Sequence, residues 1–134
     1  MTTAATTTRK RRATPKPHAT QETYYAARAL FELCAEQVER TIAARGYTVT
    51  DDMEGEEQVL ALYERQEDVK DELRYYKCRD ALRLAEEQMV AWAIDHVAAY
   101  SPAHAAEIRA MVERAKVSVV YWPKVVDSCA RLRA

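Results

Sequence analysis

The segment "MVAWAIDHVAAYSP", residues 89–102, decides the fold class. It is apolar over much of a helical circumference, as a buried helix is, and Trp92 within it is predicted to lie in the core. Ser101 followed by Pro102 predicts the start of a further helix, because serine caps a helix and proline suits its first position. The segment therefore predicts two consecutive helices, the first of them the most buried part of the chain.

Upstream of this segment the chain has no helix breaker over a long distance. Neither Gly nor Pro occurs from Glu56 to Tyr100, and a helix of that length would measure about 68 Å. Such a rod is longer than a small globular body. The apolar pattern weakens over residues 64–72, where Val69 is the only strongly apolar side chain. The sequence thus predicts a long central helix or helical arm that bends or projects into solvent there.

The two flanking regions also have helical patterns. A first helix is predicted to be capped by Thr20 and closed by Gly46, because glycine takes the left-handed conformation at a helix end. Its predicted apolar stripe consists of Ala27, Leu30, Phe31, Cys34, Val38 and Ile42. After Pro102, the apolar spacing continues to Trp122, and Pro123 is predicted to break the helix and leave a short terminal helix over residues 124–133. We therefore predict an all-α helical bundle, with residues 20–134 forming a single α-helical domain.

The N-terminal residues 1–19 are predicted to be a disordered basic tail, because they lack large apolar side chains and contain Pro15 and Pro17. Charge is unevenly distributed along the whole chain. Residues 1–22 carry a net charge of +4, residues 51–72 a net charge of −8, and residues 101–134 a net charge of +3, within a total of −1. This uneven distribution of charge indicates which partners the protein can bind and does not indicate its fold.

Several classes of chemistry are not indicated by the sequence. The three cysteines, Cys34, Cys78 and Cys129, are odd in number and widely spaced, which favours reduced thiols over a disulfide framework or a metal site. His96 and His104 lack a metal-binding or catalytic spacing, and the acidic residues from Asp51 to Glu57 lack the ligand pattern of a calcium loop. No phosphate-binding glycine loop or nucleophile motif occurs. We therefore predict a non-enzyme with no catalytic residue, no metal and no cofactor.

The chain also has no apolar run of the roughly 20 residues that cross a bilayer. We expect a soluble, cytoplasmic protein with no membrane partner, or a nuclear one if the source is eukaryotic.

Two basic segments indicate a nucleic-acid partner. The tail contains Arg9, Lys10, Arg11, Arg12 and Lys16, which could neutralise phosphates. The segment "RYYKCR", residues 74–79, adds Arg74, Tyr75, Lys77 and Arg79, a mixture of cations and aromatics that suits single strands. Other interpretations stay open: Tyr76 belongs to an apolar stripe, and the tail could be a nuclear-import signal, a solubilising extension or a clamp onto acidic residues 51–72.

Two functions follow from these observations. The first is a non-enzymatic accessory subunit that contacts DNA or RNA through the basic tail and a basic, aromatic helix face. The alternative is a purely protein-binding structural or adaptor subunit, which forms a homo-oligomer or docks into a larger complex by coiled-coil-like helix pairing. The predicted contacts for that alternative are Val59, Leu62, Tyr63 and Val69.

Overall fold

A computed structural model describes residues 16–118 and 121–134, and these residues form an all-α helical bundle, as predicted. The helices are α2 (Ala19–Ala44), α3 (Glu56–Glu72), α4 (Tyr75–Ala98), α5 (Pro102–Val117) and α6 (Trp122–Ala130). Tail residues 1–15, including Arg9 to Arg12, lie outside the described residues. Among the helices of the described ranges, none has both the length and the apolar character that a membrane span needs.

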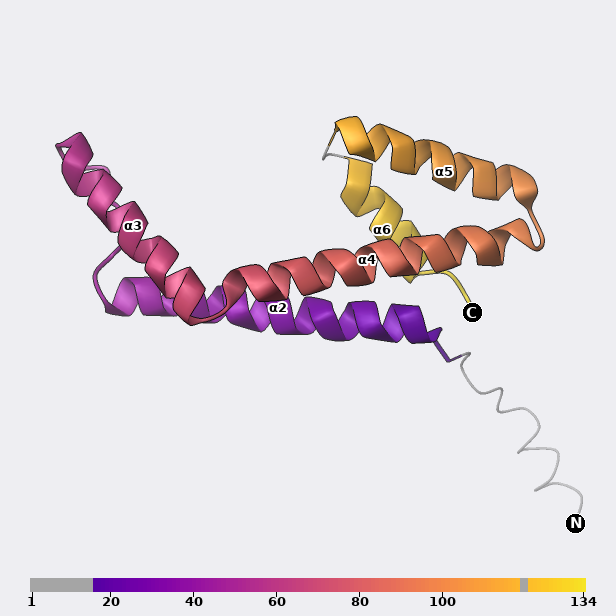
Figure 1. The fold of residues 1–134 in the computed structure, drawn as a ribbon, viewed down its shortest axis with the longest axis horizontal. Helices are drawn as coiled ribbons and strands as arrows, with labels where there is room; N and C mark the ends of the chain where they lie inside the picture. Colours follow the sequence, from indigo (N-terminus) through magenta and orange to yellow (C-terminus); the bar gives the residue numbers. More distant parts are fainter. Residues whose placement is uncertain (1–15, 119–120) are drawn as a thin grey trace, which may run out of the picture.

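Helix α4 is the centre of the bundle. Helix α2 runs antiparallel along it, while α5 and α6 cover another side of it (Figure 1). Apolar residues repeat along α4 at steps of three and four, which lets one face pack against α2. A second set on α4, Val90, Ala93 and Val97, belongs to the same buried cluster as side chains of α5 and α6. Helix α4 therefore packs against α2 on one face and against α5 and α6 on another, which accounts for its predicted apolar circumference.

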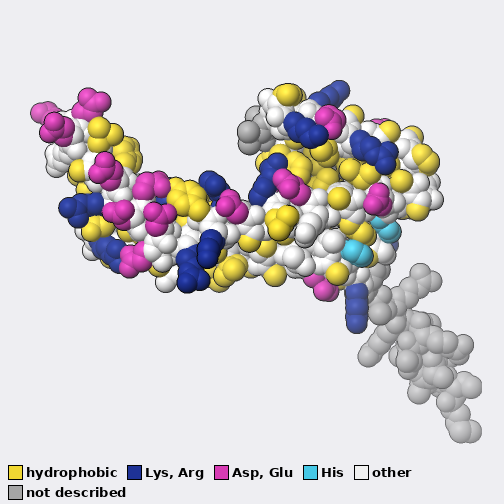
Figure 2. Space-filling view, in the orientation of Figure 1, with side chains coloured by type: hydrophobic (Ala, Val, Ile, Leu, Met, Phe, Trp, Pro, Cys, Tyr) yellow, Lys and Arg dark blue, Asp and Glu magenta, His cyan; other side chains and the backbone are white. Residues whose placement is uncertain are grey.

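Helix α3 projects from the end of the α2–α4 pair (Figure 1). Only its base contributes to a core, in a small cluster where Val69 is fully buried with Cys34 and Val38 of α2. Acidic side chains gather on α3 (Figure 2), so the predicted negative segment forms a separate lobe. We call α3 the arm.

The helical stretch over residues 56–100 is interrupted close to the predicted bend. Helix α3 ends at Glu72, and Arg74 adopts a left-handed conformation with φ of 60° before α4 begins at Tyr75. An arginine in this conformation is uncommon, because its Cβ crowds the backbone, so a sequence without glycine gives no signal for this break. The bend falls just after residues 64–72, where the apolar pattern weakens. We call residues 73–74 and the adjoining helix ends the elbow, and it turns the arm away from α4.

Three local predictions also need correction. His18, not Thr20, caps α2, because its ring nitrogen reaches the first backbone N–H groups. Leu30 is 56% exposed, since the buried face of α2 passes through Tyr24, Cys34 and Val38 instead. Trp92 is only partly buried, at the edge of the core.

The C-terminal helix differs from the prediction for a similar reason. Helix α5 ends at Val117, and Pro123 lies in the first turn of α6 instead of breaking a helix. Proline is well tolerated there, because the first helical N–H groups have no partner within the helix. Gly46 with a φ of 75° and the Ser101–Pro102 helix start match their predictions.

Candidate functional site

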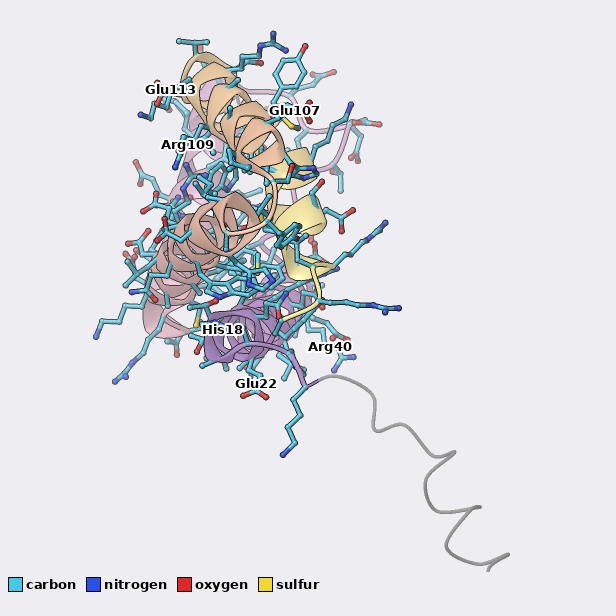
Figure 3. All side chains as sticks on the ribbon, turned by 90° about the vertical axis from the view of Figure 1, so that its right-hand side faces the viewer. His18, Glu22, Arg40, Glu107, Arg109 and Glu113 are labelled. Carbon is cyan, nitrogen blue, oxygen red and sulfur yellow. The ribbon has the colours of Figure 1, made fainter. Side chains whose placement is uncertain are left out.

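The chain enters the bundle through His18, which both caps α2 and packs on α4. Its Nδ1 accepts a hydrogen bond from the backbone N–H of Thr20 at 3.2 Å. Its ring stacks on Trp92, with centroids 4.5 Å apart and planes 11° from parallel. Figure 3 looks at this end of the molecule and shows His18 beside the start of α2, with the Glu22 side chain pointing outward. Residues 16–18 are thereby fixed against the body.

Gln21 joins this N-terminal segment to the C-terminal one. Only 1% of Gln21 is exposed, and its Oε1 accepts the backbone N–H of His18 at 2.8 Å. Its Nε2 donates to the carbonyl oxygens of Cys129 at 3.1 Å and Leu132 at 2.7 Å. These carbonyls lie at and beyond the end of α6, where helical oxygens lack partners within the helix. The buried amide of Gln21 therefore binds backbone groups at the start of α2 and at the end of α6.

Two further side chains hold the C-terminal segment in place. The hydroxyl of Tyr25 donates to the carbonyl oxygen of Ala130 at 3.1 Å. Nε2 of His96 lies 2.8 Å from the carbonyl oxygen of Arg133, so this nitrogen carries the proton and donates. The backbone carbonyls are thus bound to α2 and α4, while the side chains of Arg131 and Arg133 extend into solvent.

The result is a cluster of cations drawn from both ends of the described chain. Lys16, Arg131 and Arg133 line one hollow of about 350 Å³ and are all exposed. Arg131 also pairs with Asp127 at 3.0 Å. We call Lys16, Arg131 and Arg133 the basic end. The sequence reasoning identified Lys16 but missed the two arginines, whose signal was the net positive charge of residues 101–134.

The second predicted basic segment lies at the elbow between α3 and α4. Arg74 and Lys77 line a hollow of about 270 Å³ together with Lys70 and Tyr76. The Tyr76 hydroxyl donates to Glu67, which raises the pKa of Tyr76 and lowers the pKa of Glu67. Lys70 also pairs with Glu67, at 3.2 Å. Acidic groups therefore offset part of the positive charge at the elbow.

Tyr75 and Arg79 do not join this hollow. Tyr75 faces the α2–α4 seam, where its ring packs against Phe31 with centroids 5.3 Å apart. Tyr75 and Tyr76 are both partly buried, and it is Tyr76 that lines the hollow at the elbow, so base stacking by Tyr75 stays a prediction that its contact with Phe31 disfavours. Arg79 lies over the ring of Tyr76 at 4.9 Å and pairs with Asp80 at 3.3 Å.

The predicted partner contacts on α3 separate into two faces. Val69 is fully buried in the chain's own core, so its prediction as a contact is wrong. Val59 and Leu62 share its face and are partly buried, whereas Tyr63 is 49% exposed. Leu60, which the sequence reasoning left out, is 53% exposed. The exposed apolar face of the arm therefore consists of Leu60 and Tyr63.

The cysteines and histidines are the remaining side chains with possible chemical reactivity, and two of the cysteines are buried. Burial raises the pKa of Cys129 to about 11, and burial followed by the nearby Cys78 raises the pKa of Cys34. His96 stacks on Trp92, and His104 is exposed near the start of α5. Across residues 16–118 and 121–134, no three His, Cys, Asp or Glu side chains come together as a metal site.

The two predicted basic regions do not form one site. Lys16 lies two residues before His18, whose ring stacks on Trp92 in the C-terminal part of α4, whereas the elbow lies at the other end of α4. From Tyr75 to His96 the helix extends about 32 Å. No protein-family model, curated protein or solved structure matches this chain. Its function is therefore inferred from its own residues and their placement.

Proposed function

We propose that the chain is a non-enzymatic accessory subunit that binds the phosphate backbone of DNA or RNA through its basic end and the adjoining tail. The contacts are Arg9, Lys10, Arg11, Arg12, Lys16, Arg131 and Arg133. A segment with four consecutive cations can follow a phosphate backbone without reading base edges. Binding of this kind is weakly sequence-dependent and strongly salt-dependent.

One observation carries this proposal: Gln21 holds Arg131 and Arg133 beside Lys16, only four residues after the last of the four consecutive cations. Lys16 and the two arginines, which are separated by more than 100 residues in sequence, therefore lie together at one end of the described chain. The acidic arm lies at the opposite end of α2, which is about 39 Å long. A phosphate backbone approaching the basic end is thus kept away from the acidic groups of the arm, and at the basic end itself Asp127 pairs with Arg131.

The elbow contributes less to this function. Arg74 and Lys77 are exposed, but Glu67 and Asp71 lie beside them. Because Tyr75 is packed against Phe31, the elbow lacks the aromatic platform first expected from the sequence. The proposal consequently rests on backbone contacts at the basic end.

The test is the salt dependence of binding to a labelled DNA duplex. If all seven cations contact phosphate, the slope of log affinity against log salt is about −6, at 0.9 per contact. Replacing the arginines with glutamine in Arg131→Gln/Arg133→Gln should make the slope shallower by about 2. Replacing Arg9, Lys10, Arg11 and Arg12 with glutamine should make it shallower by about 3.5.

The matched control is Arg109→Gln/Arg114→Gln, which removes the same charge from exposed positions on α5 (Figure 3). It should leave the slope unchanged, because neither Arg109 nor Arg114 lines the hollow of the basic end or the hollow that α5 shares with Arg131. An equal change in slope for the control and for Arg131→Gln/Arg133→Gln would show that net charge alone matters. Absence of binding by the unmodified chain at low salt would overturn the proposal.

A second candidate function is protein-binding assembly, and the exposed face of the arm favours it. Leu60 and Tyr63 are about half exposed on a helix that packs against the bundle only at its base. Exposed apolar side chains on a projecting helix are normally covered by another helix. This function does not require nucleic acid, so sedimentation of the chain alone tests it.

A further inference from the structure

Helix α4 has one side that none of the described helices covers. Its other sides pack against α2 and against α5 and α6. In the view of Figure 1, α6 lies behind α4 and no helix crosses in front of it. Six exposed residues follow one another along the uncovered side at alternating steps of four and three: Lys77, Ala81, Leu84, Gln88, Ala91 and Asp95. We call these six residues the outer stripe.

The outer stripe has the spacing of a helix-pairing surface. Steps of four and three residues are those with which two helices pair along a coiled-coil seam. Near its middle lies Leu84, which is 56% exposed, and Ala81 and Ala91 lie on either side of it. Small side chains such as alanine let the axes of two helices approach closely. From Lys77 to Asp95 this surface extends about 27 Å along α4.

The two charges at the ends of the outer stripe oppose the dipole of their own helix. Lys77 lies in the first turn of α4, where the positive end of the dipole favours acidic side chains. Asp95 lies in the last turn, where the negative end favours cations. Among the ion pairs of the described residues, none includes Lys77 or Asp95. The stability of α4 itself therefore does not account for these two charges.

The outer stripe is complementary to itself in the antiparallel direction. Two copies of α4 that are paired antiparallel form three kinds of contact: Lys77 with Asp95, Ala81 with Ala91, and Leu84 with Gln88. Each contact occurs twice about a twofold axis. Each Lys77 then also lies at the negative, C-terminal end of the other copy's helix, where the dipole favours it. A parallel pair would instead place like charges together.

We propose that the outer stripe binds the outer stripe of a second copy of this chain, antiparallel and about a twofold axis, in a homodimer. Helices α5 and α6 do not obstruct this contact, because they pack on another side of α4 (Figure 1). This inference rests on the second candidate function, protein-binding assembly, and not on nucleic-acid binding. It assigns the contact to α4 instead of the arm.

The size of this contact indicates a weak dimer. One helix pair over about 27 Å buries no more surface than the smallest stable complexes, which bury roughly 1,200 Å² in total. We therefore expect a dissociation constant of about 10–100 µM. The chain is then monomeric in dilute samples. Because all six side chains are exposed in the monomer, substitutions on the outer stripe change association and leave the fold intact.

Sedimentation equilibrium of the full chain without nucleic acid, up to several hundred micromolar, tests the proposal. The unmodified chain should form dimers. Leu84→Glu should raise the dissociation constant by at least about a hundredfold, because it places two carboxylates in the middle of the contact. The matched control is Leu60→Glu on the arm, where the leucine is 53% exposed. It adds the same charge away from the outer stripe and should leave the dissociation constant unchanged.

Exchange of the two end charges tests the antiparallel direction. Lys77→Glu and Asp95→Lys should each raise the dissociation constant about tenfold, because both end contacts of the dimer become repulsive. Both substitutions suit the dipole of α4, so neither weakens the helix itself. An equimolar mixture of the two variants should form heterodimers about as tightly as the unmodified chain forms homodimers. In the heterodimer, each end contact again joins a carboxylate to an ammonium group.

The outcomes separate this inference from the functions proposed above. An unmodified chain that stays monomeric at several hundred micromolar would overturn both the pairing of outer stripes and self-association. A dimer that persists in Leu84→Glu would overturn the pairing alone, and its loss in Leu60→Glu would place the contact on the arm. A mixture of charge variants that binds no more tightly than each variant alone would overturn the antiparallel pairing. None of these results bears on the salt dependence of nucleic-acid binding.

Discussion

Replacing Gln21 with leucine should lower the free energy of unfolding by about 3 kcal/mol. Leucine has a similar volume, so the change leaves no large cavity but removes the amide. The variant loses three hydrogen bonds. The Gln21 amide donates two of them, to the carbonyl oxygens of Cys129 and Leu132, and accepts the third from the N–H of His18. Each such bond contributes about 1 kcal/mol net, and a buried group left without a partner adds to the cost.

Urea denaturation followed by circular dichroism measures this loss. The matched control is Gln88→Leu, at an exposed position on α4, which should change stability by less than about 0.5 kcal/mol. Hydrogen exchange adds a local readout, because residues 130–133 should exchange faster in Gln21→Leu than in the control. A loss below about 1 kcal/mol, with unchanged exchange at residues 130–133, would refute the role assigned to Gln21.

Two further predictions concern the elbow and the buried thiol. Arg74→Gly should raise the free energy of unfolding by about 1 kcal/mol, because glycine adopts φ of 60° without strain. Urea denaturation measures this gain, and no gain would mean that the elbow is not strained. Burial raises the folded-state pKa of Cys129 to about 11, so the free energy of unfolding should fall as the pH rises from about 9 towards 11. Urea titrations at several pH values measure this dependence, and Cys129→Ala should reduce it. A dependence of equal size in Cys129→Ala would assign it to other groups.

The helical content of this chain could be predicted from its sequence, because propensity and apolar spacing are local properties. Gly46 and the Ser101–Pro102 pair marked real boundaries for the same reason. The sequence predicted an arm that bends or projects into solvent at residues 64–72, but not the break at Arg74, which is left-handed without any local residue preference for that conformation. Pro123 was misassigned because proline suits the first turn of a helix as well as a break.

The candidate site was less predictable than the fold. The four consecutive cations Arg9 to Arg12 are evident in the sequence, but the position of Arg131 and Arg133 beside Lys16 depends on a contact between residue 21 and residues 129–132. No local pattern encodes a contact of that separation. Tyr75 and Tyr76 were exchanged in role because a single residue step turns a helical side chain by about 100°. Small errors of register therefore change which aromatic lines the hollow at the elbow.

Gln21 also has a consequence for the connectivity of the fold. Lys16 and Ala134 line the same hollow, so a short glycine-rich linker could join them without crossing the body. A circular permutant opened in the connection between α2 and α3, residues 45–55, would then place α2 directly after α6 in the chain. All helix contacts would be kept, while the pairing of α2 with α6, now distant in sequence, would become local. Such a chain should fold faster than the original if closing that long loop limits the rate.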